Sequence, residues 1–291
     1  MCRLYGLRAT HPTKAACELL DAQNALIRQS QEDARGLSNP DGWGMGHVVD
    51  GTTGCFRQVE PASESADYRE AALTTKGTTL LAHVRRATIG SPQHDNTHPF
   101  RHGAALLIHN GHVPAFEQVK PVLLNRLDSS RRGSVQGTTD SEHVLALLLQ
   151  LRDERPDALL HAVTRTAIRL LQSWVHDAAS EVQVQPVDAE ISALPHDEVT
   201  AILGLNLLWT DGTTLAGSRL NRTLWRLRRE TVPTCPICGS KHAAPPDPAT
   251  YRAAVFASER ITDEPWTEVP NGSVFATDAD GSVEIEPIGD T

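Results

Sequence analysis

The sequence has no apolar run long enough to cross a bilayer, and its N-terminus lacks a basic region followed by an apolar core. Its longest apolar stretch, AILGLNLLW at 201–209, has the length of a strand, whereas a transmembrane helix needs about 18 or more apolar residues. The five cysteines in 291 residues are few and odd in number, which argues against a disulfide framework. We therefore expect a cytoplasmic protein with free thiols and no membrane partner.

Positive charge is also scarce. The chain has 27 Lys and Arg against 36 Asp and Glu, a formal net charge of -9, so we expect no nucleic-acid partner. The basic clusters at 85–86, 131–132 and 226–229 are short, and each is interpreted as a solvated face or a local anion site. Neither a G-x-G-x-x-G motif nor a phosphate loop occurs, and we expect no cofactor.

The hydrophobic pattern predicts strands interrupted by a few helices. Apolar residues at helical spacing predict a helix at 15–31, a capping box at Thr139 and Glu142 starts a second at 139–152, and Pro156 starts a third that ends near Val175. A polar segment at 180–198 and a proline-rich insert around 230–250 are expected to be irregular. Hairpin-like connections favour an α+β fold with antiparallel sheets. The predicted strands are 4–7, 55–59, 78–84, 104–109, 202–210, 213–218, 253–259, 273–277 and 282–288.

Cys2 directly follows the initiator methionine. If Met1 is removed, Cys2 carries a free α-amine with a pKa of about 7.7–8.0 beside a thiol with a pKa of about 8.5. The amine can then take the thiol proton and later give it to a leaving amine, so one residue supplies nucleophile and base. The alternative is a small residue that simply opens a strand.

Three further positions could complete such a site. Asn110-Gly111 could supply two N–H donors to an oxyanion, although Asn-Gly is also a strong hairpin signal. Arg85 follows a predicted buried strand and could bind a carboxylate in two places. Asp140 lies in the first turn of a predicted helix, where it could face an ammonium group or simply support the helix dipole.

The order of a terminal Cys, HVRRAT, HNG and TDSE resembles the class II glutamine amidotransferases, whose nucleophile is the N-terminal residue. The motifs cover roughly residues 2–150. The segments NPDGWGMG, LLWTDGTTLAGSR and VFASERIT are similar to the stand-alone members of that superfamily, which include a hydrolase of ergothioneine biosynthesis. The resemblance implies a four-layer αββα sandwich of two antiparallel sheets, with residues 2–291 forming one domain.

The resemblance also implies a role for each residue. Cys2 would attack the side-chain amide of glutamine or of a γ-glutamyl compound, and form a γ-glutamyl thioester. Asn110 and Gly111 would form the oxyanion hole. The remaining roles concern the substrate and its pocket: Arg85 and Thr88 would bind the α-carboxylate, Asp140 the α-amine, His98 would flank the pocket, and Trp43 and Gly44 would support its floor.

The resemblance leaves the fate of the ammonia open, because no synthase motif follows residue 150. Either a separate synthase subunit receives the ammonia, or the protein is a plain hydrolase of glutamine or a γ-glutamyl compound. Bile-salt or penicillin amidases also begin Met-Cys, but they do not need the arginine for an α-carboxylate. A non-catalytic glutamine-sensing subunit is the remaining alternative, and the complete set of expected catalytic residues argues against it.

The segment CPICGSKH raises a separate question. Cys235 and Cys238 have zinc-knuckle spacing and His242 is near, but structural zinc usually takes four ligands from two such pairs. Cys17 and Cys55 are remote single cysteines, so no fourth ligand is evident. The residues could hold zinc, form a redox or adventitious thiol pair, or lie in a plain loop; we expect no metal.

Overall fold

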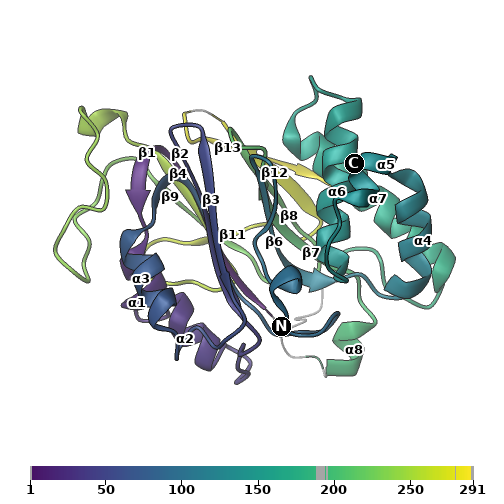
Figure 1. The fold of residues 1–291 in the computed structure, drawn as a ribbon. Helices are drawn as coiled ribbons and strands as arrows, with labels where there is room; N and C mark the ends of the chain where they lie inside the picture. Colours follow the sequence, from purple (N-terminus) through teal and green to yellow (C-terminus); the bar gives the residue numbers. More distant parts are fainter. Residues whose placement is uncertain (1, 188–193, 195, 279, 290–291) are drawn as a thin grey trace.

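Two antiparallel sheets lie face to face in the computed structural model, which describes residues 2–187, 194, 196–278 and 280–289 (Figure 1). The seven-stranded sheet has the order β11-β9-β10-β1-β4-β2-β3 and the six-stranded sheet the order β13-β12-β8-β7-β6-β5. The first contains β1 (Arg3–Lys14), β2 (Trp43–Val49), β3 (Thr52–Gln58), β4 (Lys76–Val84), β9 (Trp225–Arg229), β10 (Ala253–Ala257) and β11 (Thr267–Glu268). The second contains β5 (Phe100–His102), β6 (Ala105–His112), β7 (Gly204–Thr210), β8 (Leu215–Arg219), β12 (Ser273–Thr277) and β13 (Val283–Pro287).

Helices cover the outer face of each sheet, as Figure 1 shows. The first group, on the seven-stranded sheet, is α1 (Ala16–Leu20), α2 (Leu26–Gln31) and α3 (Ala66–Thr74). The second group, on the six-stranded sheet, includes α4 (Phe116–Arg126), α6 (Asp140–Glu154) and α7 (Leu160–Ala178). The short helices α5 (Ser129–Gly133) and α8 (His196–Thr200) lie beside them in sequence. No described helix is both long and apolar enough to span a bilayer.

Side-chain alternation along the strands produces three core layers. In β1, Leu4 joins a cluster between the sheets with Leu81, Ile108 and Phe256, whereas the next residue, Tyr5, joins the cluster beneath α1–α3. Successive residues of a strand point to opposite faces, so a sheet covered on both sides must be apolar on both. The predicted αββα sandwich is confirmed.

Several local predictions need correction. The segment predicted as one helix at 15–31 forms two short helices that residues 21–25 interrupt, and α7 begins at Leu160 rather than at Pro156. The N-cap at Thr139 is confirmed, since its hydroxyl accepts a hydrogen bond from the backbone N–H of Glu142. The Glu142 carboxylate, however, accepts from the backbone N–H groups of Gln136 and Gly137 instead of closing the capping box.

Candidate active site

Strand register brings the predicted residues to one end of the space between the sheets. Leu4 of β1 pairs with His83 of β4 and Arg3 with Val84, so Cys2 and Arg85 continue these two neighbouring strands just beyond their last pair. Side chains two residues apart on a strand point to the same face, so Cys2 points to the face of Leu4 and Asn110 to the face of Ile108. Leu4 and Ile108 both lie in the cluster between the sheets. The alternation therefore directs Cys2 and Asn110 toward each other's sheet.

Cys2 is half-buried at the start of β1. Its Sγ lies 3.3 Å from the carbonyl oxygen of Arg86 and 3.4 Å from the backbone nitrogen of Arg86, so the thiol rests against the loop after β4. Arg3 fixes the backbone here: its Nη1 donates to the Cys2 carbonyl at 3.0 Å, and its guanidinium pairs with Asp33 and Glu259. The thiol is thus positioned by the Arg86 backbone, and the Cys2 main chain by Arg3.

Arg85 is 2% exposed, yet among the described residues it has no carboxylate within ion-pair distance. Its guanidinium donates to three backbone carbonyls, those of Ile89 and Gly90 at 3.0 Å and that of Ser91 at 3.5 Å. Burial lowers the pKa of Arg85, and the nearby Cys2, Asp41 and Asp140 only partly oppose this. A buried arginine is normally paired, so this unpaired one can accept an anionic ligand.

The Asn110 side chain is 1% exposed and connects the two sheets. Its Nδ2 donates to the Ser258 hydroxyl at 3.2 Å, and the same hydroxyl accepts from the Leu4 backbone N–H at 3.1 Å. Because an amide carries two N–H donors, one remains for a ligand. Ser258 therefore ties the predicted oxyanion donor to the strand that carries Cys2.

Gly111 tolerates no side chain. Its φ of +151° is unusual for other residues, and an added Cβ would lie 2.0 Å from the Gly204 carbonyl oxygen on β7. That carbonyl lies 3.0 Å from Nε2 of His109, so the His109 ring and the Gly204 carbonyl both lie close to Gly111. Asn110-Gly111 pairs with β7 within a continuous strand, so the hairpin-turn alternative is wrong.

Asp140 is buried at the N-terminus of α6. Its Oδ2 accepts from the Val113 backbone N–H and its Oδ1 from that of Ser141, both at 2.7 Å. The Ser141 hydroxyl also lies 2.8 Å from Nδ1 of His109, whose pKa burial lowers although Asp140 opposes the shift. These contacts hold the carboxylate in place and leave it lone pairs for an ammonium group.

His98 is buried in a group of rings. It lies 4.1 Å from the His83 ring and 4.6 Å from the Phe100 ring, and neither of its nitrogens has a hydrogen-bond partner. Burial is the main cause that lowers the pKa of His98 well below its ordinary value, and His83, His109 and Arg85 add to it. Burial likewise lowers the pKa of His83 to about 3. These rings are uncharged neighbours of Arg85.

Other predicted pocket residues lie elsewhere. Thr88 is exposed in the loop after β4. Trp43 packs on the helix-covered face of β2, with its ring 5.2 Å from that of Tyr68, and not on the face between the sheets. Gly44 has a steric role, because an added Cβ would lie 2.1 Å from the His98 carbonyl oxygen.

Sequence reasoning missed Ser258 and Asp41 as site residues. Asp41 accepts from the Ala87 backbone N–H at 2.8 Å and so holds the loop after Arg85. Both residues lie in segments, NPDGWGMG and VFASERIT, that the resemblance to stand-alone members had already marked. Only the pairing of β1 with β10 shows that Ser258 lies beside Leu4, two residues from Cys2.

A second constellation differs from its prediction. Cys17, on α1, is not remote: its sulfur, those of Cys235 and Cys238 and a ring nitrogen of His242 all lie within 4.8 Å of one another. The expectation that no fourth ligand exists is therefore wrong. The 220 or so residues between Cys17 and the knuckle hid this neighbour from the sequence.

Comparison with known proteins decides the family. The family model described as "Glutamine amidotransferases class-II" matches residues 1–187, more than half of the chain. The chain belongs to the class II glutamine amidotransferases. The predicted family and its enzyme class, amidotransferase or amide hydrolase, are thereby confirmed.

Two curated relatives of this amidotransferase resemble it over most of their own length. "Probable glutamine amidotransferase DUG3" of Saccharomyces cerevisiae is 28% identical over 94% of this chain and 81% of that protein. "Gamma-glutamyl-hercynylcysteine sulfoxide hydrolase" of Mycolicibacterium smegmatis is 29% identical over 64% of this chain and 85% of that protein. Among solved structures, a glutamine aminotransferase class-II domain protein from Silicibacter pomeroyi superposes with a TM-score of 0.61 at 21% identity, covering 99% of this chain and all of that one. That structural likeness supports the fold.

Proposed function

We propose that this amidotransferase hydrolyses γ-glutamyl amides, either glutamine or a γ-glutamyl metabolite, with Cys2 as its nucleophile. The observation that carries the proposal is the buried, unpaired guanidinium of Arg85 beside Cys2 and Asp140. A charge in that position costs free energy unless a ligand neutralises it. The α-carboxylate of a γ-glutamyl group would neutralise Arg85, and its α-ammonium would face Asp140.

The reaction would run in two halves. After Met1 is removed, the α-amine of Cys2 takes the thiol proton, and the sulfur attacks the γ-carbonyl carbon. The oxyanion receives hydrogen bonds from Nδ2 of Asn110 and the N–H of Gly111. Collapse breaks the C–N bond, the leaving nitrogen takes the proton from the α-ammonium, and a γ-glutamyl thioester remains. Water then attacks the thioester, releasing glutamate and restoring the thiol.

Two substrate types fit this site. The likeness, over 64% of this chain, to a relative named "Gamma-glutamyl-hercynylcysteine sulfoxide hydrolase" supports a plain hydrolase that transfers no ammonia. The likeness to a relative named as a glutamine amidotransferase supports glutamine, with a separate synthase subunit as the recipient of ammonia. Both substrates share the α-carboxylate and α-amine that Arg85 and Asp140 would bind.

We also propose that residues 2–291 act as one domain in the cytoplasm. Strands β7 to β13 complete both sheets that the N-terminal half begins, which supports a single unit. The five cysteines are all unpaired with one another, which suits a reducing compartment.

The test is glutamate release from glutamine and a panel of γ-glutamyl amines by the purified protein, after mass spectrometry has confirmed that Cys2 is N-terminal. A glutamine-like diazoketone should label Cys2 irreversibly and add its mass to the N-terminal peptide. Cys2→Ala should abolish turnover and labelling, and Cys55→Ser should change neither.

Turnover that survives in Cys2→Ala would reject Cys2 as the nucleophile. Retention of Met1 in active protein would reject the α-amine as the base. A protein that is stabilised by glutamine, yet neither labelled nor active on any substrate, would instead be the non-catalytic sensor.

A further inference from the structure

Three thiols and an imidazole converge at the outer end of β1, away from the active site. Cys17 and Cys235 are buried, His242 is partly buried, and Cys238 is exposed. Their four ligand atoms lie within 4.8 Å of one another. We propose that Cys17, Cys235, Cys238 and His242 bind a structural Zn²⁺.

The distances suit one tetrahedral ion. With Zn–S near 2.3 Å and Zn–N near 2.0–2.1 Å, a bound sulfur and nitrogen should be about 3.6 Å apart. Nε2 of His242 lies 3.4 Å from Sγ of Cys238, already close to that separation. Four protein ligands would leave no open position for a water, so the site is structural rather than catalytic.

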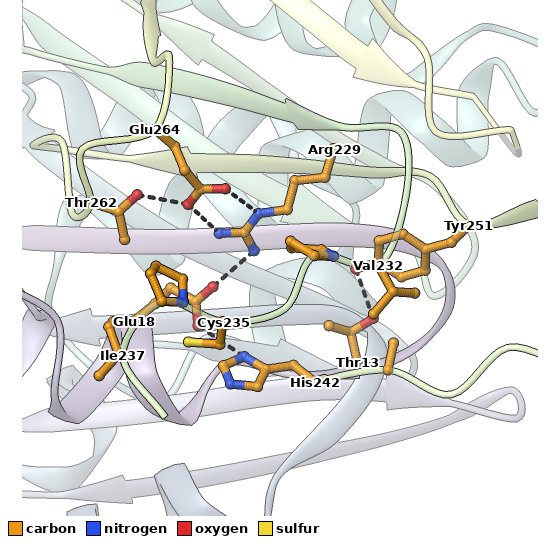
Figure 2. Close-up of a pocket in the computed structure, with 13 residues that line it drawn as sticks. Thr13, Glu18, Arg229, Val232, Cys235, Ile237, His242, Tyr251, Thr262 and Glu264 are labelled. Atoms are coloured by element: carbon orange, nitrogen blue, oxygen red, sulfur yellow. Dashed lines mark hydrogen bonds and ion pairs between the residues drawn. The ribbon is translucent and has the colours of Figure 1, made fainter. Parts of the chain in front are cut away.

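The outer partners of His242 also fit. With Nε2 toward the thiols, its Nδ1 faces Oε2 of Glu18 at 3.7 Å, and that oxygen is buried without a hydrogen-bond partner. A histidine that binds zinc typically directs its second nitrogen to a carboxylate, which fixes the ring. Arg229 in turn pairs with Glu18 at 2.8 Å and with Glu264 at 2.7 Å, and Figure 2 shows its guanidinium between the two carboxylates. The carboxylate that orients His242 is thus itself held.

The backbone already has the form of a metal knuckle. The N–H of Gly239 donates to the Cys235 carbonyl at 2.9 Å, and the N–H of Cys235 donates to the Ser240 carbonyl at 3.0 Å. Gly239 has a φ of +70°, which suits glycine in a tight turn. The His242 carbonyl accepts from the Lys14 N–H at 3.0 Å, which positions the knuckle beside α1 and its Cys17.

Zinc explains all four residues, whereas a disulfide explains only two. A disulfide between Cys235 and Cys238 would not account for the Cys17 thiol and the His242 ring, which lie at the same place. Binding of Zn²⁺ converts three thiols to thiolates and releases their three protons, with no oxidant or reductant needed. The ion would then fasten the insert between β9 and β10 to α1, across more than two hundred residues of sequence.

The experiment measures metal in protein purified without an affinity tag from zinc-supplemented medium. We expect close to one Zn²⁺ per chain by elemental analysis. Replacement with Co²⁺ should give the intense visible bands of tetrahedral cobalt and thiolate-to-cobalt charge transfer in the near ultraviolet. Cys17→Ser and Cys238→Ser should each lose most of the bound zinc, and a strong chelator should lower the Tm of the parent protein.

Cys55→Ser is the matched control, because Cys55 lies on β3 outside the cluster, and it should keep its zinc. If Cys17→Ser fails to fold, the exposed Cys238→Ser and the cobalt spectrum of the parent still decide. A parent protein with zinc near zero, or with two thiols lost to a disulfide, overturns the proposal. So does an octahedral cobalt spectrum without charge transfer. Every readout is independent of amidase activity.

Discussion

The buried Arg85 and the largely buried Arg229 have opposite surroundings. Arg229 has two carboxylates, Glu18 and Glu264, within 3 Å, whereas Arg85 has backbone carbonyls as its hydrogen-bond acceptors. Burial alone would lower both pKa values. The Glu264 and Glu18 carboxylates outweigh burial and raise the pKa of Arg229, but the groups around Arg85 do not, and its pKa is lowered. Arg229 has its counter-charges within the protein, whereas Arg85 has none within ion-pair distance in the described part of the chain. An anionic ligand is therefore expected at Arg85 and not at Arg229.

The largest effect on stability should come from removing the guanidinium of Arg229, which pairs with two carboxylates. Arg229→Met leaves the buried carboxylate of Glu18 and the half-buried one of Glu264 without this cation, and removing one partner of a buried ion pair costs about 3–5 kcal/mol. We expect the free energy of unfolding in urea to fall by that amount. Arg228→Met is the control, since Arg228 is exposed on the same strand and its loss should cost less than about 0.5 kcal/mol. Equal losses in the two variants would mean that the pairing of Arg229 contributes nothing special.

Removing the guanidinium of Arg85, which has no carboxylate partner among the residues that the structure describes, should weaken substrate binding more than it destabilises the fold. Truncating one member of a buried charge pair costs about 2–5 kcal/mol of binding, so Arg85→Met should lower kcat/KM by about 30-fold to several thousandfold, mainly through KM. Its Tm should fall less than that of Arg229→Met, because the variant leaves backbone carbonyls of the loop after β4 without a donor but leaves no carboxylate without its cation. The neighbouring Arg86→Met should leave KM nearly unchanged. An unaltered KM in Arg85→Met, or a large loss of Tm, would make Arg85 a structural residue like Arg229.

The second N–H of the Asn110 side-chain amide gives a third test. Asn110 has an N–H left over after its bond to Ser258, and removal of an oxyanion donor costs about 10²–10³ in kcat. Asn110→Ala should lower kcat by that factor with little change in KM, in steady-state assays of glutamate release. An unchanged kcat would show that the Asn110 amide only joins the sheets.

The smallest expected effect is the loss of stability that protonation of His98 causes at low pH. Burial is the main cause that lowers the pKa of His98 well below its ordinary value, and the nearby charge of Arg85 adds to it, so the folded protein binds a proton there less readily than the unfolded chain does. The unfolded chain does bind one below its ordinary pKa near 6.5, which favours unfolding by at most about 2 kcal/mol for this histidine between pH 7 and pH 5. Stability therefore falls as pH falls, and is recovered as pH rises above 6.5.

His98→Phe removes this proton site and keeps the ring contacts with His83 and Phe100. The difference in unfolding free energy between pH 7 and pH 5 should shrink in the variant, by at most about 2 kcal/mol. If the difference stays the same, His98 is protonated in the folded protein, and the active-site region tolerates a second cation.

Much of the fold followed from periodicity and local signals. The apolar run at 78–84 became β4, and Thr139 began α6 because a hydroxyl there caps a free N–H. The pattern failed where a strand carries charge. The cluster at 226–229 was interpreted as a solvated face or an anion site, yet it forms β9, and its last residue, Arg229, is directed inward to two acids. Charge type alone does not tell which side of a strand a partner occupies.

The sites show the same limit. Cys2, Arg85, Asn110 and Asp140 could be named as candidates because each stands in a short motif of its own. Ser258 and Cys17 were not, because their roles depend on partners more than two hundred residues away. Such contacts arise from strand order, which a local pattern does not contain.

The place of β1 has a consequence for synthesis of the chain. The strand that begins beside Cys2 lies between β4 and β10, and β10 is made of residues 253–257. At about 5–20 residues per second, a ribosome needs tens of seconds or less to reach that point. Until then the nascent strand has an unpaired edge, Ser258 is missing, and the Asn110 donor has nothing to hold it. The N-terminal processing that the proposed mechanism requires has that whole interval, and a chain cut short before residue 258 should never become an amidase.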